Sequence, residues 1–87
     1  MASIEQVKAA LAQAAEQSNT TTSQIRATIE STEQVLTQLR TVAAGTGHPA
    51  LSEAIARAEQ TKQRLIEAAT TLQGSTAAAR QYISILG

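Results

Sequence analysis

Hydrophobic residues recur along the chain at alternating intervals of three and four, in two long segments separated by one short interruption. The pattern keeps its phase from Ile4 to Val42 in the first segment and from Leu51 to Leu86 in the second. This spacing places the hydrophobic residues along one stripe of a helix, as in coiled coils. We therefore expect two helices, over residues 3–44 and 50–86, each carrying a coiled-coil-like seam.

The seam residues are the candidate interaction sites. The first seam is expected at Ile4, Val7, Leu11, Ala14, Ser18, Thr21, Ile25, Thr28, Thr32, Val35, Leu39 and Val42, widened by Ala15, Ile29, Leu36 and Ala43. The second is expected at Leu51, Ala54, Ala58, Thr61, Leu65, Ala68, Leu72, Ser75, Ala79, Tyr82 and Leu86, widened by Ile55, Ala69 and Ile83. The principal interaction residues are the larger ones: Val7, Leu11, Ile25, Ile29, Leu36, Leu39, Leu51, Ile55, Leu65, Leu72, Tyr82 and Leu86.

The interruption between the two segments contains Gly45, Gly47 and Pro49. Glycine adopts left-handed backbone conformations at little cost, which suits the end of a helix. Proline is favoured in the first turn of a helix, because its missing N–H is not needed there. We expect a turn over residues 45–49, with Ser52 as an alternative cap of the second helix. The chain is thus an all-α, antiparallel two-helix hairpin forming a single domain over residues 1–87.

Two stretches weaken the helical pattern. Residues 18–23 are all Ser, Asn or Thr, which compete with the helix for backbone hydrogen bonds, and Gly74 interrupts the second segment. The first helix either runs through residues 18–23 or breaks there, with Thr22 or Ser23 capping a new helix. Folding the chain about its turn brings residues 18–19 level with residues 74–75. The polar seam residues there either hydrogen-bond across the interface or simply allow the backbones to approach.

The composition indicates a thin core. Hydrophobic residues make up 43% of the 87 residues, but most are alanine, Tyr82 is the only aromatic residue, and cysteine is absent. Small domains usually need disulfides, a metal or oligomerisation to be stable, and thiol chemistry is unavailable here. We therefore expect association into a four-helix bundle, either as a homo-oligomer or with a helical protein partner.

Charge and hydropathy argue against several partners. Seven basic and seven acidic residues are spread along the chain and cancel to zero net charge, so no basic patch for nucleic acid is expected. No apolar run approaches the ~20 residues of an integral membrane segment. The first residues lack the pattern of a signal peptide. We expect a cytoplasmic protein, or one exported without a cleaved signal peptide.

The sequence contains little catalytic potential. His48 is the only histidine, and aspartate is absent, so neither a catalytic constellation nor a metal site is expected. No cofactor and no enzymatic activity are predicted. Tyr82 begins the run Tyr-Ile-Ser-Ile-Leu, the densest large hydrophobic patch of the chain. It either covers the N-terminal residues at the open end of the hairpin or forms an exposed docking tip.

The two seam-bearing segments, the Gly45-Thr46-Gly47-His48-Pro49 turn and the terminal Tyr82-x-x-x-Leu86 resemble the Ala/Gln-rich helical hairpins of small actinobacterial proteins, and the leader modules of polymorphic toxins. More distantly, the chain is similar to the WXG-motif family of type VII secretion substrates, although it contains no tryptophan. The resemblance implies a non-catalytic interaction hairpin used in secretion or toxin targeting. A cytoplasmic structural or scaffolding coiled coil is the alternative.

Overall fold

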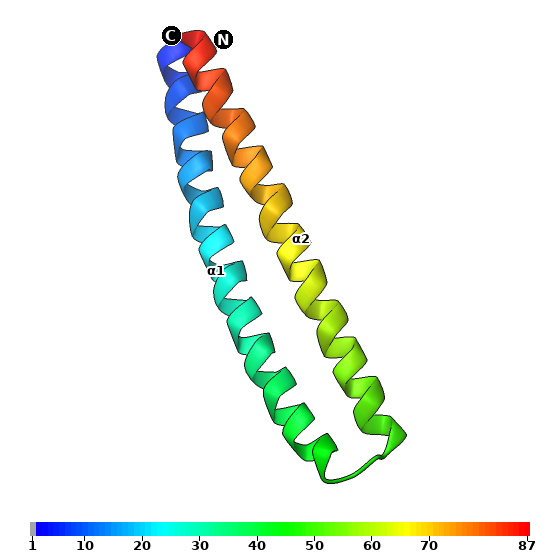
Figure 1. Ribbon diagram of the computed structural model, residues 1–87. Coiled ribbons are helices and arrows are strands. Elements are labelled where there is room, and N and C mark those ends of the chain that lie inside the picture. The colour runs from blue at the N-terminus through cyan, green and yellow to red at the C-terminus, as the bar shows by residue number, and fades with distance from the viewer. Residues whose placement is uncertain (1) are drawn as a thin grey trace.

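The computed structural model describes residues 2–87 and contains two long helices in this range. Helix α1 spans Ile4–Ala44 and helix α2 spans Pro49–Leu86. They run antiparallel, so both termini lie at one end and the turn at the other (Figure 1). The molecule is a rod with principal extents of 63 × 19 × 14 Å. The expected all-α two-helix hairpin is confirmed.

Both helix starts are fixed by local capping. The side chains of Ser3 and Gln6 exchange hydrogen bonds with each other's backbone N–H, which forms the capping box of α1. At the start of α2, Nδ1 of His48 accepts a hydrogen bond from the N–H of Ala50 at 3.1 Å. Pro49 is therefore the first residue of α2 rather than the last of the turn, and Ser52 lies inside the helix.

Helix α1 runs without a break through residues 18–23, so the interpretation with a second cap there is wrong. The hydroxyls of Thr20 and Thr22 donate to the carbonyl oxygens of Glu16 and Ser18, one turn earlier. These hydrogen bonds satisfy the polar side chains without removing any backbone bond of the helix. Helix α2 likewise continues through Gly74.

The turn between the helices does not use left-handed glycine. Gly45 has φ −93° and ψ −7°, and Gly87 is the only glycine of residues 2–87 with a positive φ. The left-handed conformations that glycine permits are therefore not used at Gly45 or Gly47. Gly45 instead donates its N–H to the carbonyl oxygen of Val42, and Thr46 donates its N–H to that of Ala43, which continues the right-handed sense of α1 past its last residue.

The two helices contact each other along one row of residues on each. We call these the inward rows, because their members are buried or half-buried, again at spacings of three and four. The inward row of α1 is Leu11, Ala15, Ser18, Thr22, Ile25, Ile29, Thr32, Leu36, Leu39 and Ala43. The inward row of α2 is Leu51, Ile55, Ala58, Lys62, Leu65, Ala69, Leu72, Thr76, Ala79, Ile83 and Leu86.

The inward face of each helix differs from the expected seam by a rotation of about 50° about the helix axis. This is the angle between neighbouring directions when seven residues are distributed around a helix over two turns. Every second expected position is inward, but the positions between them are exposed and the widening residues replace them. As interface positions within the hairpin, the following are wrong: Ala14, Thr21, Thr28, Val35, Val42, Thr61, Ala68, Ser75 and Tyr82. Hydrogen bonding across the core through Thr21 and Ser75 is therefore also wrong.

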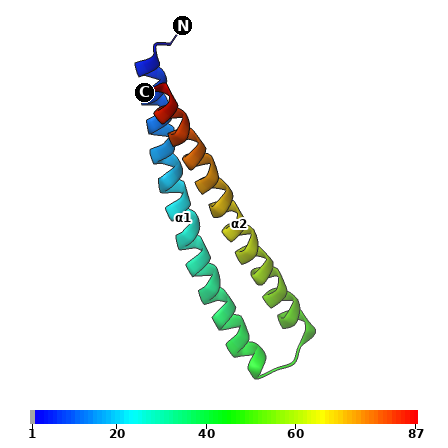
Figure 2. The same ribbon diagram turned by 45° about the horizontal axis from the view of Figure 1, so that its top comes forward.

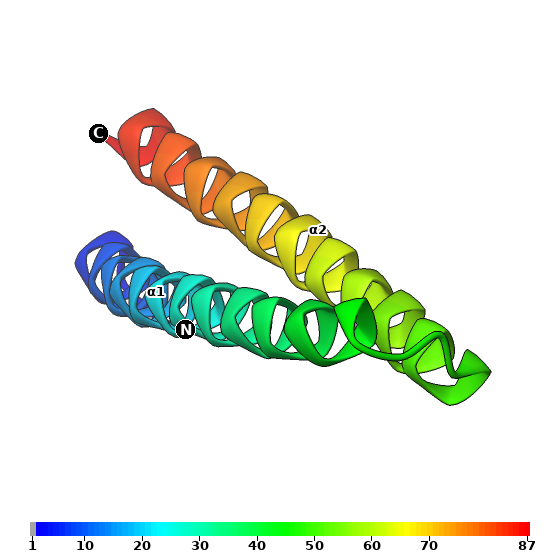
Figure 3. The same cartoon turned by 60° about the horizontal axis from the view of Figure 1, so that its bottom comes forward.

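The core between the helices is thin. Ala15, Leu36 and Ala69 are its buried hydrophobic residues, and Leu36 is 1% exposed. The buried Thr22 and Thr76 donate their hydroxyls to carbonyl oxygens of their own helices, so they do not link α1 to α2. The axes are also slightly inclined, as Figure 3 shows from the turn end. A single pair of inclined helices thus shields only a narrow stripe of each.

Within residues 2–87, neither helix is apolar enough over a sufficient length to span a membrane.

Candidate interaction surface

Most of the predicted interaction residues lie between the two helices. Leu36 is buried, and ten others are half-buried: Val7, Leu11, Ile25, Ile29, Leu39, Leu51, Ile55, Leu65, Leu72 and Leu86. Tyr82 is the exception, with 48% of its surface exposed. These eleven side chains hold the hairpin together, and any surface for a partner must lie outside the inward rows.

One side of the hairpin carries three of the six large hydrophobic side chains that the fold leaves exposed within residues 2–87, namely Val35, Val42 and Tyr82. We call it the uncharged flank, because each of its residues is apolar or carries only a hydroxyl group. On α1 it comprises Ala14, Thr21, Thr28, Val35 and Val42, and on α2 it comprises Ala54, Thr61, Ala68, Ser75 and Tyr82. Ala54 is half-buried and the other nine residues are exposed. Val35 and Val42 are 46% and 55% exposed, which is high for large aliphatic side chains in a monomer.

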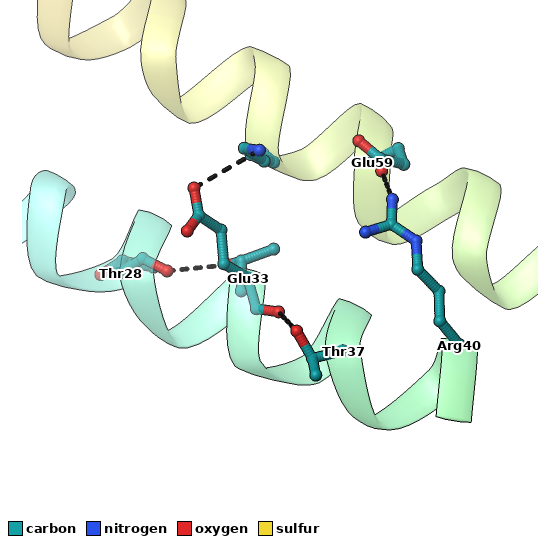
Figure 4. Close-up of polar contacts among 7 residues, drawn as sticks. Thr28, Glu33, Thr37, Arg40 and Glu59 are labelled. Carbon is teal, nitrogen blue, oxygen red and sulfur yellow. Dashed lines mark hydrogen bonds and ion pairs between the residues drawn. The ribbon is translucent and has the colours of Figure 1, made fainter. Parts of the chain in front are cut away.

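The opposite side of each inward row has a different character. We call it the charged flank, and it comprises Ala12, Asn19, Arg26, Glu33 and Arg40 on α1 and Glu59, Ile66, Gln73 and Arg80 on α2. Arg40 forms an ion pair with Glu59 across the two helices (Figure 4). Nζ of Lys62, on the inward row, lies 3.4 Å from a carboxylate oxygen of Glu33, the partner expected for it from the sequence.

The Arg40–Glu59 ion pair establishes which sides of the two helices coincide. It joins the charged flank of α1 directly to that of α2, so both lie on the same side of the plane through the two axes. The uncharged flank of each helix lies across the inward row from its charged flank. The two uncharged rows therefore also share one side, and together they form a continuous face along the rod.

A shallow groove opens on the uncharged flank where α2 passes the middle of α1. Ile25, Ala68, Leu72 and Ser75 contribute to its lining, which is largely apolar, and its volume is about 560 Å³. Arg64, Glu67 and Thr71 also line it. The groove exists because alanine and serine are too short to fill the space beside the inward leucine and isoleucine.

The open end of the hairpin does not close as one interpretation required. Ile4, Tyr82 and Ile85 are 57%, 48% and 73% exposed, whereas Val7, Leu11 and Leu86 are half-buried, so the open end is covered only in part. In the view of Figure 2 the first turn of α1 extends past the end of α2. Ile4 is the first residue of α1, and its high exposure agrees with this position. Tyr82 instead projects from the uncharged flank and adds the largest side chain to that face.

His48 has a structural part in the turn. It is exposed, and its Nδ1 caps α2, so that nitrogen is already engaged as an acceptor. Within residues 2–87, no group of three or more His, Cys, Asp or Glu side chains is placed to hold a metal ion. Three of the seven acidic residues form ion pairs instead: Glu53 with Arg57 at 2.9 Å, Glu33 with Lys62 and Glu59 with Arg40.

No protein family model matches the chain, and no curated protein or solved structure matches it. The surface must therefore be interpreted from its own residues.

The division into two flanks is the feature of the candidate surface that the hydrophobic pattern alone did not reveal. The apolar stripe is three positions wide in every seven, and the sequence does not say which two of the three face the other helix. A signal was present in the charges. The uncharged flank takes every seventh residue, from Ala14 to Val42 on α1 and from Ala54 to Tyr82 on α2. None of the fourteen charged residues of the chain occupies one of these positions.

Proposed function

We propose that this protein is a non-catalytic helical interaction module that self-associates or binds a helical partner through its uncharged flank. The observation that carries the proposal is the exposure of Val35, Val42 and Tyr82 on one face that lacks charged residues. Soluble monomers rarely expose long apolar faces, and such faces usually mark protein–protein contacts. The opposite face, with its ion pairs, is suited to solvent.

The assembly that fits this face is a four-helix bundle with coiled-coil-like packing. A hairpin that presents a row from each of two antiparallel helices offers two further ridges to a second pair of helices. Alanine, serine and threonine along these rows would let the helix backbones approach closely. Burial of this face would also thicken the core, which holds only three buried hydrophobic residues within residues 2–87.

The test compares two single variants, each of which places one negative charge on a different flank. In Val35→Glu the charge lies on the uncharged flank, and in the matched control Ile66→Glu it lies on the charged flank. The two wild-type side chains are β-branched and similarly exposed, at 46% and 38%. We expect Val35→Glu to weaken association by at least tenfold, because the carboxylate loses its hydration in the contact. Ile66→Glu should leave association unchanged.

The measurements are light scattering after size exclusion, together with recovery of helical partners from the native host. Circular dichroism on both variants checks that the hairpin remains folded. Equal effects of the two substitutions on association would contradict the proposal.

The cellular context is part of the same proposal. The resemblance in architecture to toxin leader modules and type VII secretion substrates supports a role in secretion or toxin targeting. Recovery of the uncleaved chain from culture supernatant would support export, whereas strict retention in cells would favour a scaffolding role for the same interaction surface.

A further inference from the structure

The contacts between the helices show which residues of the uncharged flank lie at the same height along the rod. The groove shared by Ala12, Ala15, Arg80 and Ile83 places Ala14 level with Tyr82. The pairing of Glu33 with Lys62 places Val35 level with Thr61.

The same reasoning extends to the other flank residues. The pairing of Arg40 with Glu59 places Val42 near Ala54, and the regular seven-residue spacing puts Thr28 with Ala68 and Thr21 with Ser75. The flank is therefore a ladder of five pairs, each with one residue from α1 and one from α2.

The sizes of the paired residues follow a pattern. At the two levels nearest the turn, α1 supplies valine and α2 supplies alanine or threonine. At the level nearest the open end the order is reversed, because α1 supplies Ala14 and α2 supplies Tyr82. Three of the five levels thus combine a larger side chain on one helix with a smaller one on the other, Val35 and Thr61 are nearly equal in size, and the level of Thr21 and Ser75 combines two small side chains.

We propose that a second copy of this chain docks on the uncharged flank about a two-fold axis parallel to the rod, with both turns at the same end. This inference rests on the proposed function and specifies its partner. In this arrangement α1 of one copy faces α2 of the other at equal heights. Val35 then meets Thr61 of the second copy, and Tyr82 meets Ala14 of the second copy.

The side-chain sizes along the uncharged flank favour the orientation with both turns at the same end over the one with the turns at opposite ends. With the turns at opposite ends, each helix would face its own counterpart. Tyr82 would then lie beside the α2 segment around Thr61, and the small residues Ala68 and Ser75 would face each other. That arrangement crowds both ends of the contact between the two α2 helices and leaves a gap in its middle, which costs packing energy in each place.

The area to be covered matches a second hairpin. A compact monomer of 9.1 kDa exposes roughly 4,900 Å², whereas this chain exposes 6218 Å². The excess of about 1,300 Å² is that of the whole rod, and it is larger than the roughly 800 Å² that each partner buries in a standard interface. The rows that meet in this arrangement carry no charged residue, and the charged side chains nearest to them are Arg64 and Glu67, which line the groove beside them.

The experiment uses cysteine cross-linking, since the natural chain has no cysteine. Two single variants, Ala14→Cys and Tyr82→Cys, are mixed, refolded together and oxidised. A disulfide requires Cα atoms within about 7 Å. We expect a mixed covalent dimer in high yield, and little dimer from either variant alone. Ala12→Cys, which lies on the charged flank of the same helix, is the matched control and should not cross-link to Tyr82→Cys.

The other outcomes are separable. Efficient cross-linking of Tyr82→Cys to Thr61→Cys, with none to Ala14→Cys, would overturn the proposed orientation. A monomeric mass at all concentrations, with no cross-linking, would overturn the second copy as the partner. The proposed function would survive that result if a helical host protein binds the monomer and Val35→Glu, but not Ile66→Glu, abolishes the binding.

Discussion

The two flanks of the hairpin are built from the same two helices and differ in what they leave exposed. The charged flank carries the Arg40–Glu59 ion pair, and the Glu33 carboxylate on it reaches Lys62 across the helix pair. The uncharged flank presents hydroxyl groups, methyl groups and one aromatic ring. Both flanks border the same inward rows, so the difference between them cannot come from the requirements of the hairpin itself.

The comparison shows how little the charged flank contributes to stability. Exposed ion pairs are typically worth about 0.2–1 kcal/mol each, and Arg40 and Glu59 are 55% and 38% exposed in their side chains. These pairs are better suited to selecting which faces of α1 and α2 meet. The uncharged flank, by contrast, holds apolar area whose burial is worth roughly 25 cal/mol per Å². The larger energetic reserve of the molecule therefore lies on the face that is still uncovered.

We expect the largest change in unfolding free energy at the boundary between the inward row and the uncharged flank, where two adjacent residues lie on opposite sides. Leu36 is 1% exposed on the inward row, whereas its neighbour Val35 is 46% exposed on the uncharged flank. Leu36→Ala should cost about 2–5 kcal/mol of unfolding free energy, because it leaves a cavity in an already thin core. Val35→Ala should leave the stability of dilute protein almost unchanged and weaken association. Urea titrations at two protein concentrations distinguish the two effects.

A loss of equal size for the two alanine variants in dilute protein would show that Val35 already belongs to the core. In that case the boundary between the inward row and the uncharged flank would be misplaced.

Gly74→Ala offers a stabilised background for the same comparison. Gly74 is exposed inside α2, and a Cβ at this position would contact nothing within 4 Å. Glycine inside a helix costs about 1 kcal/mol relative to alanine, so the variant should raise the unfolding free energy by about that amount. Thermal unfolding followed by circular dichroism measures the gain.

The flank variants can then be repeated in the Gly74→Ala background. If Val35→Glu still dissociates the assembly when the hairpin is more stable, the effect is one of contact and not of unfolding. If its effect disappears, partial unfolding explains the original result and the uncharged flank loses its special status.

Several features of the fold follow from local sequence and could be predicted. The Ser3–Gln6 capping box, Pro49 in the first turn of α2 and the apolar spacing depend on residues close together in the chain. The rotation of each helix about its axis could not be predicted, because a stripe three positions wide fits the partner in two ways. Ala14 and Ala15 are equally suitable by size, and packing along the whole rod decides between them.

The turn shows a second limit of sequence reasoning. Gly45 and Gly47 permit left-handed conformations, but Gly45 is right-handed, and no positive φ occurs at either position. Glycine indicates where the chain can turn and leaves the geometry of the turn open. The candidate interaction residues were difficult to assign from the sequence for a related reason. Val35 and Tyr82 follow the seam pattern, yet each is exposed and faces away from the other helix of the hairpin.

The smallest expected effect concerns the charged flank and depends on salt. Arg40→Gln removes the ion pair with Glu59 and should lower the unfolding free energy by about 0.2–1 kcal/mol at low ionic strength. The difference from wild type should shrink in 1 M NaCl, because salt screens exposed charges over a few Å. Association through the uncharged flank should be as strong in 1 M NaCl as in dilute buffer, since it involves no charge. Sedimentation equilibrium and urea titration at both salt concentrations check this pair of expectations. Association that weakens steeply with salt would place the charged flank in the contact and reverse the roles assigned to the two faces.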